Sequence, residues 1–284
     1  MIISVASGKG GTGKTTVATN MAAAIDEQVT FLDCDVEEPN AHLFLKPEIT
    51  TRQPVYTFLP DIDQQRCDRC RKCAEICRFG AITVVGEQIL LFPELCHSCG
   101  GCMLVCPQRC IDEGQRELGH AESATVKNIA FHHGILRIGE AMSPPLIKWL
   151  RKNFEKTGTV IIDAPPGTSC PVIAAMHETD YIVLVTEPTP FGLHDLALAH
   201  QTVNELGIAS GLVINRAGLG DHSVQRYAEE NNLPILLEIP FSREVAELYS
   251  RGRLLVEGSP KWRNIFVSLF EEIIRQIPAT GKVS

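Results

Sequence analysis

The chain has 284 residues, of which 44% are hydrophobic and 21% charged, a balance typical of a globular protein with a buried core. Lysine and arginine total 26 against 34 acidic residues, so the formal net charge is -8, which gives no reason to expect a nucleic-acid or anionic-membrane partner. We see no signal peptide and no apolar run long enough to cross a bilayer, so we expect a cytoplasmic protein.

Short apolar segments alternate with segments of helical period along most of the chain. Buried strands are expected over 2–6, 29–33, 135–139, 159–163, 181–185, 211–215 and 234–239. Helices are expected between most of them, for example over 15–25, 144–155 and 195–207. This alternation predicts an α/β fold with a doubly wound, mostly parallel sheet, whose ligands bind at the carboxyl ends of the strands.

A glycine-rich segment, SGKGGTGKTT at residues 7–16, follows the first expected strand and precedes the first expected helix. Its spacing fits the phosphate-binding pattern GxxxxGK[ST]. Backbone N–H groups of such a loop cradle phosphates, Lys14 reaches the β and γ phosphates, and the Thr15 hydroxyl ligates Mg²⁺. We expect the nucleotide to bind Gly8, Gly10, Gly11, Thr12, Gly13, Lys14, Thr15 and Thr16.

The same loop carries a second lysine, Lys9. The variant resembles the deviant phosphate loop of the MinD, ParA and Mrp branch of P-loop ATPases, which also contains the nitrogenase iron protein. The resemblance covers nearly all of the chain outside residues 61–115. Its further motif residues are Asp33 and Asp35 of a DxD pair, Asp163 at a strand end, Gly167 and Asn215. It implies an ATPase that binds ATP, ADP and Mg²⁺ and dimerises with itself or with a related ATPase.

The resemblance also implies roles for individual residues. Lys9 is the signature lysine that reaches across the dimer to the partner's phosphates, where it neutralises charge in the transition state. Lys14 and Asp35 complete the catalytic set, with Asp35 positioning the attacking water. Asp163 holds Mg²⁺ together with Thr15. The alternative for Lys9 is a solvated loop lysine.

Contacts to adenine are implied for Asn215 and for the segment IPFS, at Pro240 and Phe241. Neither feature is specific by itself. An asparagine at a strand end often only caps a turn, so that alternative for Asn215 remains open.

Eight of the eleven cysteines fall in two runs of the form CxxCxxCxxxC between residues 67 and 106. In a chain of this kind, cysteines indicate metal or redox chemistry more than disulfides. The spacing is that of bacterial ferredoxins with two [4Fe–4S] clusters, in which the fourth cysteine of each run ligates the other run's cluster. One cluster is therefore expected on Cys67, Cys70, Cys73 and Cys106, and the other on Cys96, Cys99, Cys102 and Cys77. Zinc is the alternative.

The cysteine runs lie where the alternating pattern stops. We expect residues 61–115 to form an inserted, small α+β ferredoxin domain, which leaves 1–60 and 116–284 as one discontinuous P-loop ATPase domain. About 55 residues with few large apolar side chains build little core, so cluster binding should supply much of the folding free energy. Arg78 replaces the proline usual after the first run, which removes a fixed φ and adds a charge.

Three cysteines, Cys34, Cys110 and Cys170, lie outside the two runs. Cys170 has the spacing from Asp163 of a cysteine that ligates the dimer-bridging cluster of the nitrogenase iron protein. Since no second such cysteine is evident, a buried structural thiol is favoured for Cys170. The last apolar helix, over 262–277, has an acidic polar face, so it is expected to pack in the core and not on a membrane.

Together these features predict an ATP-dependent, dimerising ATPase coupled to an iron–sulfur electron-transfer module. It would act in electron delivery or in metal-cofactor or iron–sulfur assembly, with a redox or metal-cofactor protein as partner. One alternative is a positioning ATPase of the ParA and MinD kind that uses the clusters as a redox sensor. Another is a plain electron carrier whose ATP site only holds structure.

Overall fold

The structure, a computed structural model, describes residues 1–154 and 158–277. The chain divides into two compact units. The first comprises Met1–Arg52, Ala121–Ile135 and Ile147–Ser284, and the second comprises Gln53–His120 and Leu136–Leu146. The second unit is longer than the segment 61–115 expected for an insertion, because two long strands lead into and out of it.

The first unit is built on seven parallel strands in the order β11-β10-β9-β1-β8-β2-β7. In chain order these are β1 (Ile2–Ala6), β2 (Val29–Asp33), β7 (Ile129–Leu136), β8 (Thr159–Asp163), β9 (Tyr181–Thr186), β10 (Ser210–Ala217) and β11 (Ile235–Pro240). Strands β2 and β9 are buried throughout and β8 is buried except at its first residue, as expected for a parallel sheet covered on both faces. Asp163 of β8 pairs in register with Asp33 of β2, so two carboxylates meet at one edge of the sheet.

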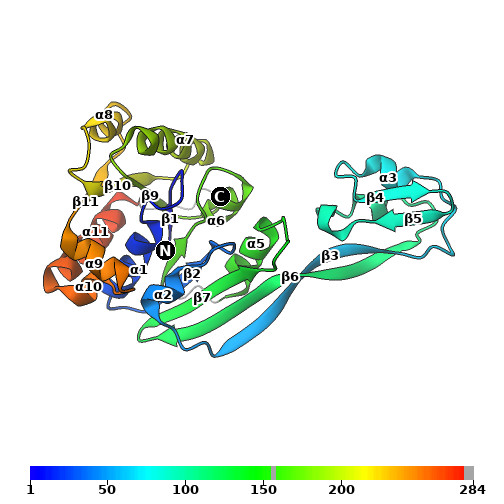
Figure 1. The fold of residues 1–284 in the computed structure, drawn as a ribbon, viewed down its shortest axis with the longest axis horizontal. Coiled ribbons are helices and arrows are strands. Elements are labelled where there is room, and N and C mark those ends of the chain that lie inside the picture. The colour runs from blue at the N-terminus through cyan, green and yellow to red at the C-terminus, as the bar shows by residue number, and fades with distance from the viewer. Residues whose placement is uncertain (155–157, 278–284) are drawn as a thin grey trace. The chain divides into compact units, whose positions relative to one another are not determined.

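Helices connect these strands (Figure 1). They are α1 (Lys14–Ala24), α2 (Ala41–Leu45), α5 (Pro144–Asn153), α6 (Cys170–Met176), α7 (Pro190–Leu206), α8 (Ser223–Glu230), α9 (Arg243–Ser250), α10 (Leu255–Gly258) and α11 (Pro260–Gln276). Helix α11 packs beside α1 and α10, and its residues Trp262, Phe266, Leu269 and Ile273 are buried in the main core. This confirms the expected core role of the last helix. Within the described residues, no helix is long and apolar enough to cross a membrane.

One strand prediction is wrong. Residues 135–139 were expected to form a strand, but β7 begins at Ile129 and ends at Leu136, and the chain turns at 138–139. The sequence of β7 contains His132 and His133, which broke the apolar run, whereas in the fold their rings bond Ser123 and Glu122. The other six expected strands correspond to β1, β2, β8, β9, β10 and β11. Of the helix expected over 144–155, Glu155 lies outside the described residues.

The second unit contains most of β3 (Thr51–Ile62) and of β6 (Ile111–Val126), which are neighbours in the strand order. A hydrogen bond from the Asp63 N–H to the Cys110 carbonyl, at 2.8 Å, links the two segments just beyond the strand ends. The smaller elements are α3 (Lys72–Ile76), β4 (Ile82–Val85), β5 (Gln88–Leu91), a 3₁₀ turn η1 (Pro93–Leu95) and α4 (Gly101–Leu104). Strands β4 and β5 form an antiparallel hairpin.

The second unit has a small core. The core cluster around its cysteines consists of Cys73, Ile82, Ile89, Cys102, Cys110 and Ile111. Three of these six side chains are thiols, so little of this cluster is hydrocarbon. The unit therefore has a weak apolar contribution to its stability compared with the first unit.

Candidate functional site

The glycine-rich loop joins β1 to α1 and needs glycine at two positions for different reasons. Gly13 has a φ of +99°, and a Cβ there would lie 2.3 Å from the amide nitrogen of Asn215. Gly8 faces α7, where a Cβ would lie 2.1 Å from the carbonyl oxygen of Asp195. Gly8 thus serves close packing of the loop against α7, whereas Gly13 serves the turn into α1.

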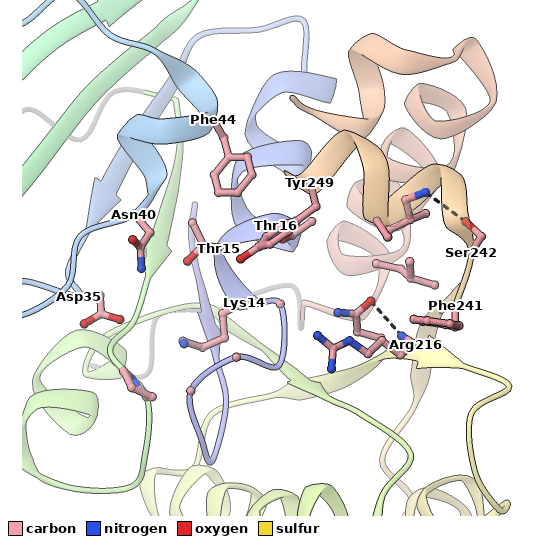
Figure 2. Close-up of a pocket in the computed structure, with 18 of the residues that line it drawn as sticks. Lys14, Thr15, Thr16, Asp35, Asn40, Phe44, Arg216, Phe241, Ser242 and Tyr249 are labelled. Carbon is pink, nitrogen blue, oxygen red and sulfur yellow. Dashed lines mark hydrogen bonds between the residues drawn. The ribbon is translucent and has the colours of Figure 1, made fainter. Parts of the chain in front are cut away.

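A cavity of about 320 Å³ opens beside this loop (Figure 2). Of the residues expected from the sequence, it is lined by Gly10, Gly11, Gly13, Lys14, Thr15, Thr16, Asp35, Asn215, Pro240 and Phe241. Gly8, Lys9, Thr12 and Asp163 were also expected in the site but are not among the lining residues. Figure 2 shows Lys14, Thr15, Thr16 and Asp35 on one side and Arg216, Phe241 and Ser242 on the other. Beyond the loop the lining is mixed, because Ile239, Val245 and Ala246 add apolar side chains beside the polar Arg216 and Ser242.

Thr15 and Asp163 form the polar centre of the site. The Thr15 hydroxyl donates to Oδ2 of Asp163 at 2.6 Å, and Asp163 is fully buried. Its other oxygen, Oδ1, has no hydrogen-bond partner within the described residues. Burial raises the pKa of Asp163 to about 6, against the effect of nearby Lys14. A hydroxyl and a carboxylate with an unsatisfied buried oxygen are oxygen ligands of the kind that Mg²⁺ prefers.

The two aspartates of the DxD pair are in different environments. Asp33 is fully buried, and its carboxylate accepts the backbone N–H groups of Asp35 at 3.1 Å and Ala41 at 3.0 Å. Asp35 lines the cavity, and its burial raises its pKa to about 6. Asp33 therefore shapes the loop that presents Asp35 to the cavity.

Lys9 points to an acidic residue of its own chain. Its ammonium lies 2.9 Å from Oε1 of Glu187, and Oε2 of Glu187 accepts from Arg216 at 2.8 Å. The Lys9 side chain is 30% exposed and that of Glu187 is 12% exposed. Glu187 thus connects the second lysine of the loop with Arg216, a cavity residue that the sequence analysis missed.

Asn215 ties β10 to the glycine-rich loop. Its amide nitrogen donates to the Thr12 carbonyl at 2.8 Å, and its amide oxygen accepts the N–H of Arg216 at 2.9 Å. One amide N–H and one lone pair remain for a ligand.

Two aromatic residues at the cavity were also missed, Phe44 from α2 and Tyr249 from α9. Their ring centroids are 5.4 Å apart. Neither belongs to a motif, so no local signal marks them.

The first set of expected cluster ligands lines one small pocket of the second unit. Cys67, Cys70, Cys73 and Cys106 line it, together with a fifth cysteine, Cys110. The sulfurs of Cys106 and Cys110 are 3.5 Å apart. A backbone N–H, that of Arg69, points to the sulfur of Cys67 at 3.3 Å, the kind of contact that stabilises a thiolate.

In the second set, Cys96 and Cys102 are buried and Cys99 is exposed. Burial raises the pKa of Cys102 to about 11, and the nearby thiols of Cys96 and Cys99 act in the same direction. Cys77, the fourth expected ligand, follows α3, and its sulfur accepts the N–H of Ala81 at 3.3 Å. Helices α3 and α4, one from each run, pack against each other.

Both runs have the same backbone pattern. Left-handed φ values occur two residues after the first cysteine, at Arg69 and Ser98, and again two residues later, at Arg71 and Gly100. They recur three residues after the last cysteine, at Gly80 and Arg109. Non-glycine residues rarely adopt this conformation, so its repetition at matched positions indicates one loop design used twice.

Among the described residues, no three His, Cys, Asp or Glu side chains are arranged around the position of a single metal ion. A cubane cluster places its four thiolates farther apart than a single ion does. Grouped thiols, backbone N–H groups directed at sulfur and left-handed turns around them fit a cluster-binding loop.

Comparison with known proteins gives three findings. Residues 3–256 match the family described as the CobQ/CobB/MinD/ParA nucleotide binding domain. Two uncharacterized proteins of Methanocaldococcus jannaschii are 28% and 29% identical, covering 89% and 96% of this chain and 90% and 96% of their own. A cytosolic Fe-S cluster assembly factor Nubp2 homolog of Anopheles gambiae is 25% identical, covering 99% of this chain and 97% of its own.

Solved structures of similar fold include MinD proteins. The cell division ATPase MinD of Pyrococcus furiosus has a TM-score of 0.60 at 24% identity, covering 96% of this chain and 98% of its own. The septum site-determining protein MinD of Pyrococcus horikoshii, complexed with Mg-ADP, has a TM-score of 0.59 at 21% identity, covering 99% of each chain. At these identities the likeness concerns the fold.

Proposed function

Since the chain belongs to the CobQ/CobB/MinD/ParA nucleotide binding domain family and is a P-loop ATPase of the MinD and ParA type, we propose that its ATP cycle is coupled to electron transfer through two [4Fe–4S] clusters. The role is electron delivery, or assembly of iron–sulfur or other metal cofactors, in the cytoplasm with a redox or metal-cofactor protein as partner. The observation that carries this proposal is the pocket lined by Cys67, Cys70, Cys73 and Cys106 in the same chain as a nucleotide cavity.

The nucleotide phosphates bind the loop residues from Gly8 to Thr16, and adenine lies towards Asn215, Pro240 and Phe241. Mg²⁺, when bound, supplies positive charge at the phosphates. Thr15 and Asp163 hold that ion, a role supported by the unsatisfied buried oxygen of Asp163. Asp35 lines the cavity on the same side as Lys14 and orients the attacking water (Figure 2).

Lys9 acts between two copies of the ATPase, either identical or related. In the single chain its ammonium is held by Glu187. To reach a partner's phosphates the lysine leaves that carboxylate, so dimer formation and the Lys9 ion pair compete. A charge placed by the partner in this way favours the transition state of phosphoryl transfer.

The second unit serves as the ferredoxin-like part, with clusters on the two expected sets of cysteines. When bound, the clusters supply one-electron transfer, and the protein supplies thiolates and backbone N–H groups that set the potential. The relative from Anopheles gambiae, named as an Fe-S cluster assembly factor, supports this field of activity. A single zinc ion in each run is the competing occupant.

The test is the ATPase rate of anaerobically purified protein, measured with oxidised protein and again after reduction with dithionite. Iron, acid-labile sulfide and zinc are quantified in the same sample. We expect iron and sulfide in the ratio of [4Fe–4S] clusters, and a rate that depends on redox state and is lost in Lys9→Ala. Zinc in place of iron would overturn the cluster assignment, and a rate indifferent to reduction would overturn the coupling.

A further inference from the structure

Cys110 is a fifth thiol in a pocket that needs four ligands. It is 1% exposed, it belongs to the small core of the second unit, and it lines the pocket with Cys67, Cys70, Cys73 and Cys106. Its sulfur lies 3.5 Å from that of Cys106, within hydrogen-bond range for sulfur. No role for it follows from the spacing of the two cysteine runs.

The repeated loop design shows which residue occupies the matching place in the other run. Cys110 follows Cys106 by four residues, and Ala81 follows Cys77 by four. The positions just before them, Arg109 and Gly80, both have left-handed φ values, 47° and 65°. Ala81 is 2% exposed, so the two positions are alike in burial as well as in backbone. The two sites therefore differ at this position by one S–H group.

Binding of Cys106 to iron determines which of the two sulfurs, that of Cys106 or that of Cys110, donates the hydrogen bond. A cysteine that binds iron is a thiolate and has no proton to donate, so Cys110 must be the donor. Water does not take over this contact, because the Cys110 side chain is buried beside Ile62, Val84 and Ile89. At the matching place beside Cys77, the side chain of Ala81 has no donor, and only its backbone N–H points to the Cys77 sulfur, at 3.3 Å.

We propose that the Cys110 thiol donates a hydrogen bond to the sulfur of Cys106 and makes the site of Cys67, Cys70, Cys73 and Cys106 the higher-potential site of the two. This inference rests on the proposed cluster binding. A hydrogen bond to a ligand sulfur offsets negative charge, which favours the reduced state. A single electron from a low-potential one-electron donor is then held at the site of Cys67, Cys70, Cys73 and Cys106. An electron that enters at the other site moves to this one, and the other site becomes oxidised again.

The experiment is a redox titration of the full chain with dithionite under anaerobic conditions, followed by electron paramagnetic resonance. The unchanged protein should show two one-electron midpoints. In Cys110→Ala the higher midpoint potential should fall by up to about 59 mV. This corresponds to a roughly three- to tenfold smaller ratio of reduced to oxidised cluster at a fixed potential. Cys110→Ser keeps a donor and should keep the higher midpoint.

The matched variant is Ala81→Cys, which adds a thiol at the corresponding place beside Cys77. It should raise the lower midpoint and leave the higher one nearly unchanged. Iron content and ATP affinity, measured on every variant, show that each chain is folded and loaded.

Two results would overturn the inference, and they are distinguishable. If both clusters are present and Cys110→Ala shifts neither midpoint, or shifts both equally, Cys110 does not separate the sites and the proposed function stands. If the unchanged chain holds no iron–sulfur cluster, the proposed function falls and the inference falls with it.

Discussion

Glu187 determines what Lys9 can do in the single chain. Its carboxylate is 12% exposed and holds both Lys9 and Arg216. Removing this charge should free the Lys9 ammonium and favour an ATP-dependent dimer. We expect a gain of roughly 1 kcal/mol, or about fivefold in the association constant of the dimer. We expect Glu187→Gln to show this increase in sedimentation velocity with ATP, in an Asp35→Asn background that slows hydrolysis.

The control is the same substitution in a chain that lacks the lysine. If Glu187 acts through Lys9, Glu187→Gln should leave the dimer constant of Lys9→Ala unchanged, which is a double-mutant cycle. An equal gain with and without Lys9 would assign the effect to Arg216 or to the net charge of the surface.

Asn215 bonds the loop through the Thr12 carbonyl, at 2.8 Å. Because that bond serves any nucleotide, Asn215→Ala should weaken binding of both ATP and GTP, by about 1 kcal/mol each. Titration calorimetry with the two nucleotides measures this. Asn231→Ala, which removes an amide bonded to the Tyr227 carbonyl away from the cavity, should change neither affinity. A loss for ATP alone would show that the amide reads adenine and that the loop does not depend on it.

At the scale of an element, α11 offers two side chains that test whether the helix is a core element. Phe266 is fully buried in the main core, whereas Ile274 is 46% exposed on the same helix. Phe266→Ala should lower the free energy of unfolding by about 3 to 5 kcal/mol. Ile274→Ala should lower it by about 1 kcal/mol or less. Chemical denaturation monitored by circular dichroism makes the comparison, and equal losses would contradict core packing.

The strands differ in how visible they are in the sequence. A strand such as β9 is buried on both faces and reads as the apolar run YIVLVT, so pattern analysis finds it. Strands β3 and β6 alternate buried and exposed residues or contain proline and charge, and they were missed. Each of these two strands is stabilised by pairing with the other, and a pattern within one short segment does not show that pairing.

At the scale of the whole molecule, the two units should respond differently to loss of the clusters. In the core cluster around the cysteines of the second unit, three of the six buried side chains are thiols, whereas the first unit has a large hydrocarbon core. Chelation of iron should therefore raise hydrogen exchange in the segment Gln53–His120 and leave β1, β8 and β9 protected. Hydrogen exchange with mass spectrometry measures both regions at once. Unchanged exchange in the second unit would mean that its fold does not depend on metal.

The sequence by itself determined the nucleotide loop and the two sets of cysteines, because each is a motif whose residues are adjacent in the chain. Six of the seven parallel strands of the first unit were equally visible as short apolar runs, whereas His132 and His133 interrupt the run of β7. The family match confirms the ATPase branch that the loop indicated, while the assignment of cluster ligands stays a prediction.

Only the tertiary structure decided which of these side chains meet. The Lys9 ion pair with Glu187, the Asn215 bond to the Thr12 carbonyl and the position of Cys110 beside Cys106 are examples. The first two join residues more than a hundred positions apart, and the third depends on the left-handed turn at Arg109. The two long-range contacts arise when strands pair and helices pack around a common core, and no local pattern of side chains encodes them.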